Sequence, residues 1–149
     1  MRVLLQRVRT ASVEAGGEQV AKIGPGLLLL VGFGEADRGD WQSKIGRAAE
    51  KLVNLRVFAN DRGRLDHSVV DIHGDILAVP QFTLYGKSHK GRRPDFTDAM
   101  DPAVASPAFD AFRTALESAL GKTVPAGVFG AEMQVTLVND GPLTLQFEF

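Results

Sequence analysis

The chain has 149 residues, of which 44% are apolar and 23% charged, with a net charge of −1 and no cysteine. These values fit one globular domain over residues 1–149 and exclude a disulfide scaffold, a thiol nucleophile and a globally basic nucleic-acid binder. The longest apolar run, residues 26–33, is too short to span a bilayer, so we expect a cytoplasmic protein with neither a membrane nor a DNA partner.

The first third of the chain reads as strands and turns. Alternating and continuous apolar runs predict strands at 1–9, 12–15, 18–23 and 27–33, the second and third forming a hairpin across Gly16-Gly17. The last of these strands is apolar throughout, which predicts burial on both faces.

Two helices are predicted. The first begins after Asp40, and the second begins with Ser106 as its cap and ends at Gly121. Their apolar stripes are Trp41, Ile45, Ala48, Leu52 and Leu55, and then Phe109, Phe112, Leu116 and Ala119. Further strands are predicted at 75–85, 131–138 and 143–148, with a long loop at 86–105. The fold class is therefore α/β, a single mixed domain whose largely antiparallel, barrel-like sheet is covered by two helices.

Two motifs have plain structural explanations. Gly32-Phe-Gly34 suggests a dinucleotide loop, but Asp37 stands where a third glycine would be, and a simple turn between strand and helix explains it better. His67 and His73 lie among aspartates, but their spacing matches no ligand pattern and is more typical of turns. We therefore expect no metal and no cofactor.

A basic segment, Lys87-Ser-His-Lys-Gly-Arg-Arg-Pro94, gathers four fixed positive charges in eight residues of a neutral chain. Such a loop could bind phosphates through Lys90, Arg92 and Arg93, or it could be a solvated loop without a partner. Residue chemistry alone leaves both interpretations open.

Polar side chains end the strand predicted at 75–85. If the strand continues through this point, Gln81 and Thr83 share one face, where an amide and a hydroxyl could position a carbonyl or a water. No base for the Thr83 hydroxyl can be read from the sequence, so it is a weak nucleophile by itself.

Several segments together resemble the D-aminoacyl-tRNA deacylases of the bacterial and eukaryotic type. Two of them are specific: Gln81-Phe-Thr-Leu-Tyr85 and Asn139-Asp-Gly-Pro-Leu-Thr144. Other matching segments, in the same order along the chain, begin at Met1, Ala11, Ile23, Lys51, Lys90 and Phe129. The resemblance thus runs from one end of the chain to the other.

The resemblance implies hydrolysis of the ester that joins a D-amino acid to the 3′ end of tRNA, with L-aminoacyl-tRNA rejected. It also raises glycyl-tRNA mischarged on tRNA(Ala) as a second substrate. It implies a homodimer with active sites at the subunit interface, where a cis Gly141–Pro142 bond enters the partner's pocket. The reaction site would comprise Gln81, Phe82 and Thr83, and Asn139, Gly141, Pro142, Met133 and Phe129 would bind and select the substrate.

One residue departs from the family's pattern. Pro80 stands where the family usually has serine, which removes a hydroxyl and a backbone N–H. A related animal paralogue that clears L-alanine from tRNA also has Pro-Gln here but lacks the following Phe. Phe82 therefore favours the D-specific type. The alternatives are a non-catalytic RNA-binding dimer that uses the basic loop, and a metal-dependent hydrolase that uses His67 and His73.

Overall fold

The computed structural model describes residues 1–89 and 91–149. The elements in chain order are β1 (Arg2–Ala15), β2 (Glu18–Ile23), β3 (Gly26–Gly32), the 3-10 turn η1 (Glu35–Asp37), α1 (Trp41–Val53), β4 (Phe58–Ala59), β5 (Leu65–His67), β6 (Asp75–Pro80), the 3-10 turn η2 (Phe82–Tyr85), α2 (Pro102–Leu120) and β7 (Met133–Glu148).

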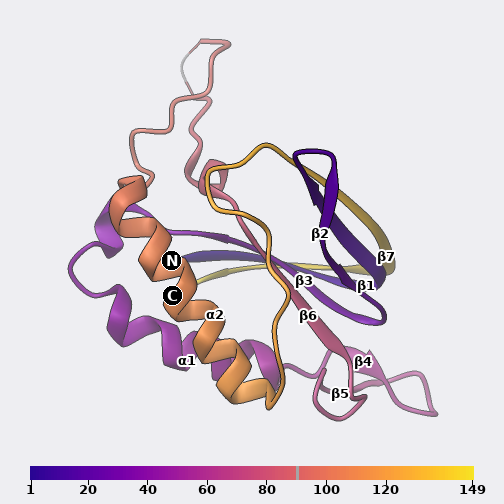
Figure 1. Ribbon diagram of the computed structural model, residues 1–149. Coiled ribbons are helices and arrows are strands. Elements are labelled where there is room, and N and C mark those ends of the chain that lie inside the picture. Colours follow the sequence, from indigo (N-terminus) through magenta and orange to yellow (C-terminus); the bar gives the residue numbers. More distant parts are fainter. Residues whose placement is uncertain (90) are drawn as a thin grey trace.

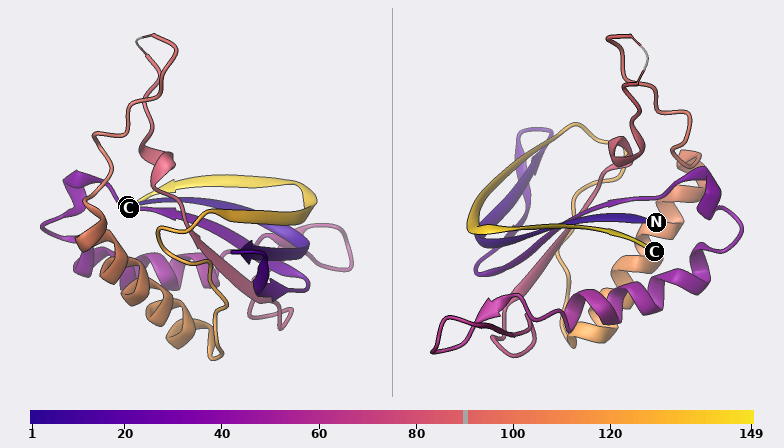
Figure 2. Two further views of the ribbon diagram at one scale, coloured as in Figure 1. Left: turned by 45° about the horizontal axis from the view of Figure 1, so that its top comes forward. Right: turned by 180° about the vertical axis from the view of Figure 1, so that it is seen from behind.

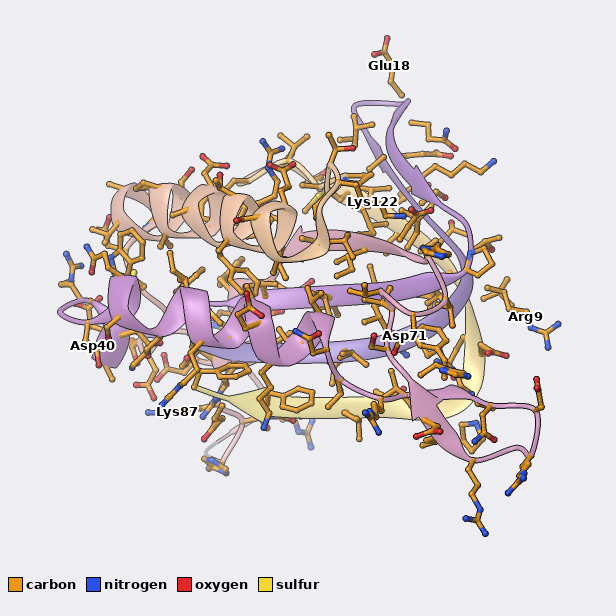
Figure 3. The ribbon with its side chains drawn as sticks, turned by 90° about the horizontal axis from the view of Figure 1, so that it is seen from below. Arg9, Glu18, Asp40, Asp71, Lys87 and Lys122 are labelled. Carbon is orange, nitrogen blue, oxygen red and sulfur yellow. The ribbon has the colours of Figure 1, made fainter. Side chains whose placement is uncertain are left out.

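The fold is built around one curled sheet (Figure 1, Figure 2). Its strands follow the order β2-β1-β3-β6, and β7 also pairs with β1. Within this sheet only the β3–β6 pairing is parallel. The helices α1 and α2 lie side by side against one face of the sheet (Figure 3). This arrangement confirms the predicted mixed α/β class, with a largely antiparallel sheet covered by two helices.

The strands are longer than the hydrophobic pattern predicts. Residues 1–9 and 12–15 belong to one strand, β1, whose hairpin with β2 turns at Gly16-Gly17 as expected. Likewise, the two predicted final strands are halves of β7, which bends near Asn139 and pairs with β1 along both halves. The register between β1 and β7 shifts on either side of Val8, as is typical where a paired strand bends.

The core lies on both faces of β3. Leu27, Leu29 and Val31 pack in the cluster beneath the helices, whereas Leu28 packs in a second cluster on the opposite face. This confirms the prediction of a strand buried on both faces. The predicted helix stripes are also confirmed, because their residues are buried or packed against the first cluster.

The start of α2 was predicted wrongly. The helix begins at Pro102, with the Asp101 carboxylate accepting a hydrogen bond from the Ala103 N–H at 2.8 Å, and Pro107 lies inside it. Asp-Pro supplies the same cap-and-proline signal as Ser106-Pro107 but earlier, and Pro107 then lies in the interior of the helix, where it donates no backbone hydrogen bond. The end at Gly121 is as predicted, with a positive φ of 75°.

The strand predicted at 75–85 is also corrected. β6 ends at Pro80, and the chain then forms η2, closed by hydrogen bonds from the Leu84 N–H to Gln81 O and from the Gly86 N–H to Thr83 O. Its neighbour β3 ends at Gly32, so a longer β6 would lack a partner on that side. Gln81 and Thr83 therefore do not share a strand face.

Close packing explains the Gly32-Phe-Gly34 motif. A Cβ added at Gly32 would lie 2.7 Å from the Gln81 carbonyl oxygen, and one added at Gly34 would lie 2.3 Å from Cε1 of Tyr85. The two glycines make room for η2 at the end of β3. This bears out an ordinary strand-to-helix turn, with a packing role that the sequence did not reveal.

Candidate functional site

A mainly apolar cavity of about 670 Å³ opens between η2, the start of α2 and the segment that leads into β7. Four of the predicted site residues line it: Gln81, Phe82, Phe129 and Met133. They come from positions about fifty residues apart in the chain, and the fold brings them to one cavity. A few polar groups in a mainly apolar cavity are typical of a small-ligand site.

The first wall of this cavity is the turn that follows β6. Phe82 is 56% exposed, and its ring meets the ring of Phe96 edge to face at 5.3 Å between centroids. The Gln81 side-chain amide donates a hydrogen bond to Oγ1 of Thr83, so the two polar groups meet although they lie on a turn. Thr83 itself is exposed and is not among the residues that line the cavity.

The opposite wall comes from the segment before and at the start of β7. Phe129 is half-buried and packs against the main core, while Met133 packs against the second cluster. The Met133 sulfur accepts a hydrogen bond from the Val128 N–H at 3.3 Å, and a Cβ added at Gly127 would lie 2.7 Å from that sulfur. This wall is therefore held by backbone contacts as well as by packing.

Sequence reasoning missed part of this cavity. Phe96, Met100, Asp101 and Phe109 also line it, from the long loop and from α2. Phe96 was detectable as a lone aromatic side chain in a loop rich in charge, glycine and proline. Asp101 was missed because the start of α2 was predicted too late in the chain. It was therefore assigned to the long loop, whereas it caps α2.

The second predicted motif lies elsewhere in the same copy of the chain. The Gly141–Pro142 bond is cis, as expected, but neither residue lines the cavity, and Asn139 does not line it either. Asp140, between them, pairs with Arg9 at 3.2 Å. Arg9 and Lys87, which is at the base of the basic loop, lie toward opposite ends of the molecule in Figure 3. One copy therefore does not bring the two motifs together.

Side-chain contacts hold this second motif in place. The Asn139 amide donates to the carbonyls of Arg7 at 3.0 Å and Leu143 at 3.2 Å. A Cβ added at Gly141 would lie 2.7 Å from Oδ1 of Asn139, so a larger residue there would displace the Asn139 side chain. Gly141 and Pro142 are exposed.

Arg7 is a further residue that the sequence did not single out. Its guanidinium is mostly buried, donates to the Asp140 carbonyl at 2.9 Å and also bonds to the Val57 carbonyl. The available signal was weak, because Arg7 is one of several charged residues in β1 and only the folded structure shows that it is the mostly buried one at the bend. Arg7 thus connects the bend of β7, at Asp140, to the segment after α1, at Val57.

The described parts of the basic loop, residues 87–89 and 91–94, extend away from the body of the molecule (Figure 1). Its stem is closed by reciprocal backbone hydrogen bonds between Lys87 and Asp95 at 2.8 Å, and Lys87 also pairs with Asp98 at 2.5 Å. Arg92 and Arg93 are exposed, whereas Lys90 lies outside the described residues. Two of the three predicted phosphate-binding side chains are therefore accessible to a partner.

Two further observations concern metal ligands and membrane-spanning helices. Within residues 1–89 and 91–149 no group of three or more His, Asp or Glu side chains is placed to hold a metal ion. In the same ranges no helix is long and apolar enough to cross a membrane.

A buried carboxylate lies behind η2. Asp37 is 4% exposed, and its oxygens accept hydrogen bonds from the Met1 ammonium and Lys44 at 2.7 Å, the Gly34 N–H at 2.9 Å and the Tyr85 hydroxyl at 3.0 Å. Burial acts to raise the pKa of Asp37. The hydrogen bonds from Lys44, the Met1 ammonium and Gly34 outweigh it and lower this pKa from 3.8 to about 2.

This pKa predicts a pH-dependent loss of stability. Because the folded pKa is depressed, the contribution of Asp37 is complete above the ordinary value of 3.8 and is lost as pH falls through about 2. It amounts to about 2 kcal/mol at neutral pH. Denaturant unfolding of the wild type and of Asp37→Asn should give free energies that differ at pH 7 and converge in this acidic range. A difference that stays constant down to the lowest pH would contradict the prediction.

Comparisons with known proteins agree with one another. The family model described as D-Tyr-tRNA(Tyr) deacylase matches residues 4–148. A D-aminoacyl-tRNA deacylase of Dechloromonas aromatica (strain RCB) is 50% identical over 148 residues, which cover 99% of this chain and 97% of the relative. One from Roseiflexus castenholzii (strain DSM 13941 / HLO8) is 50% identical over 145 residues, covering 97% and 90%.

Solved structures share the fold. One described as c-Myc DNA Unwinding Element Binding Protein superimposes with a TM-score of 0.90 at 38% identity and covers 100% of this chain and 99% of its own. Another, a probable eukaryotic D-amino acid tRNA deacylase, gives a TM-score of 0.84 at 22% identity over 98% and 97% of the two chains, which supports the fold alone. With a family model over nearly the whole chain and relatives at half identity, the chain belongs to the D-Tyr-tRNA(Tyr) deacylase family.

Proposed function

We propose that this protein, as one domain over residues 1–149, hydrolyses the ester of D-aminoacyl-tRNA, releases the D-amino acid and the tRNA, and rejects the L-aminoacyl form. The observation that carries the proposal is that Gln81, Phe82, Phe129 and Met133 line one cavity in a chain of this family. We place the reaction in the cytoplasm, without a metal or an organic cofactor. The cavity is the place for the 3′-terminal aminoacyl group.

The reaction needs a placed water and stabilisation of the oxyanion, because an aminoacyl ester is already activated. Across residues 1–89 and 91–149, the N–H groups of Phe82 and Thr83 donate no hydrogen bond to a protein group. They lie at the start of η2, beside the cavity, and are available to an oxyanion. The Gln81 amide and Thr83 hydroxyl would orient the ester or the water, and the terminal ribose 2′-hydroxyl would assist.

Selection between enantiomers is assigned to Asn139, Gly141 and Pro142 of a second copy. In one copy these residues lie away from the cavity and are exposed. In a homodimer they would reach the partner's cavity, where the Gly141 carbonyl would accept the amino group of a D-residue and collide with an L side chain. Because a backbone carbonyl does not read side-chain identity, several D-amino acids should be substrates.

Matched pairs of aminoacyl-tRNA test this function. D-tyrosyl- and L-tyrosyl-tRNA, and the corresponding aspartyl pair, are incubated with the protein with and without a chelator. We expect release of the D-amino acids only, unaffected by the chelator. Binding without release would support a non-catalytic RNA-binding dimer, and loss of activity with the chelator would support a metal site at His67 and His73. Equal rates on D and L esters would contradict chiral selection and point to Pro80 as a relaxing change. Glycyl-tRNA(Ala) is included as a third substrate.

Thr83→Ala should slow the reaction without abolishing it. The Thr83 hydroxyl accepts a hydrogen bond from Gln81, and within the described residues no base receives its proton. A loss below about 100-fold is expected, the lower end of what a general base contributes. Rapid quenching followed by mass spectrometry should find no acyl group on Thr83, and finding one would contradict the prediction.

The double change Arg92→Ala, Arg93→Ala should weaken tRNA binding and flatten its dependence on salt. Each lost phosphate contact lowers the slope of log K against log salt by about 0.7 to 0.9, so a reduction of about 1.5 is expected. Arg62→Ala, Arg64→Ala is the matched control, because these exposed arginines lie in the turn between β4 and β5. Figure 1 shows that hairpin at the other end of the molecule from the basic loop. Equal slopes for the wild type and the Arg92, Arg93 variant would mean that the loop binds no phosphate. Duplex DNA as competitor tests whether the loop prefers tRNA.

A further inference from the structure

The turn that carries the proposed reaction site has little packing of its own. Phe82 and Thr83 are exposed, and Gln81 is only half-buried. Their orientation therefore depends on what holds the two ends of the turn. At the first end, the Gln81 N–H donates to the Val31 carbonyl at 2.7 Å, which anchors the turn to β3.

Tyr85 anchors the other end. Its ring lies against Gly34, where an added Cβ would come within 2.3 Å of Cε1, and near Gly32. The Arg2 guanidinium covers the ring, with Cζ 4.5 Å from the centroid, and Nη1 of Arg2 donates to the Leu84 carbonyl at 2.9 Å. The ring is thus held between a glycine surface and a cation.

The Tyr85 hydroxyl reaches the buried Asp37. Oδ2 of Asp37 accepts a hydrogen bond from this hydroxyl at 3.0 Å, and the same oxygen accepts the hydrogen bond from the Gly34 N–H. Met1 and Lys44 neutralise the carboxylate on its other oxygen. Met1 also exchanges hydrogen bonds with Phe149, which brings both chain ends to this point, as the right-hand view of Figure 2 shows. Residues from four separate parts of the chain therefore converge behind η2.

We propose that Tyr85 is a positioning residue for deacylation: Asp37 and Arg2 hold its hydroxyl and ring, and thereby fix the turn that presents Gln81 and Thr83 to the substrate. This inference rests on the proposed function. It differs from a purely structural role because it predicts a defect in the chemical step of protein that is folded and binds tRNA. Tyr85 itself does not line the cavity.

Single-turnover kinetics test the proposal. With enzyme in saturating excess over D-tyrosyl-tRNA, the rate does not depend on the fraction of active enzyme. Tyr85→Phe, which removes only the hydroxyl, should lower this rate by about 10-fold to 100-fold, because small displacements of positioned groups have effects of that size. Its affinity for tRNA should stay within about twofold of the wild type. Arg38→Ala is the control, since it breaks an exposed pair with Glu35 in the neighbouring turn and should leave the rate unchanged.

A spectroscopic readout reports the anchor directly. Tyr85 is the chain's single tyrosine, so tyrosinate absorbance during alkaline titration belongs to it alone. Burial, the charge of Asp37 and their hydrogen bond raise its pKa, Arg2 acts in the opposite direction, and Glu148 adds a small further increase. Asp37→Asn should therefore shift the titration to lower pH and slow single turnover together.

A Tyr85→Phe rate within about twofold of the wild type would overturn the proposal. So would an Asp37→Asn variant whose tyrosine titration moves while its rate does not. If Tyr85→Phe does not fold, the Arg2→Gln variant tests the proposal instead. The Arg2 side chain is partly exposed, and this substitution removes its guanidinium from the Tyr85 ring and from the Leu84 carbonyl. An unchanged Arg2→Gln rate would then overturn the proposal. If the wild type itself releases no D-amino acid, the proposed function fails, whereas the titration still reports the Tyr85–Asp37 contact.

Discussion

Gly34→Ala is expected to lower the rate of D-aminoacyl-tRNA hydrolysis by about 100-fold. The backbone of Gly34, with φ −99° and ψ 160°, is extended and suits any residue. The effect therefore comes from the added Cβ, which would lie 2.3, 2.7 and 3.0 Å from three atoms of the Tyr85 ring. The ring is confined by Arg2 and Asp37, so it must leave its position and displace η2.

Gly39→Ala is the matched control for this change. Gly39 lies in the same connection between β3 and α1, and a Cβ added there meets no atom within 4 Å. Its activity should equal that of the wild type. Steady-state and single-turnover deacylation, with circular dichroism to confirm folding, measure both variants. A Gly34→Ala enzyme with wild-type activity would show that the position of the Tyr85 ring does not matter for the site.

Phe112→Ala is expected to lower the free energy of unfolding by about 3 to 5 kcal/mol. Phe112 is fully buried on α2 and belongs to the cluster between the helices and the sheet. Removing the ring loses its transfer free energy and leaves a cavity that the surrounding side chains fill only in part. Urea or guanidinium unfolding measures the change.

Phe82→Ala makes the same chemical change at an exposed position. Its ring is 56% exposed and meets mainly Phe96, so stability should fall by about 1 kcal/mol or less. Deacylation should fall sharply, because Phe82 lines the cavity. Phe112→Ala should therefore mainly lower the free energy of unfolding, whereas Phe82→Ala should mainly lower the rate of deacylation. If Phe82→Ala is as active as the wild type, the cavity is not the reaction site.

The sequence by itself determined the features that depend on local patterns. The buried β3, the hairpin at Gly16-Gly17 and the stripes of both helices follow from hydrophobic periodicity and turn chemistry, and the structure confirms them. The resemblance named Gln81, Phe82, Phe129 and Met133 together, and the fold brings these four to one cavity. It also named the cis bond at Gly141–Pro142.

The tertiary structure decided whatever depends on distant partners. η2 replaces the end of the predicted strand because β3 offers no partner beyond Gly32. α2 begins at Pro102, capped by Asp101, although the later Ser106-Pro107 pair carries the same local signal. The charged cluster at Asp37 joins residues 1, 34, 44 and 85, which no local pattern relates. A buried carboxylate is stable only when several donors surround it, and only the folded chain brings those donors together.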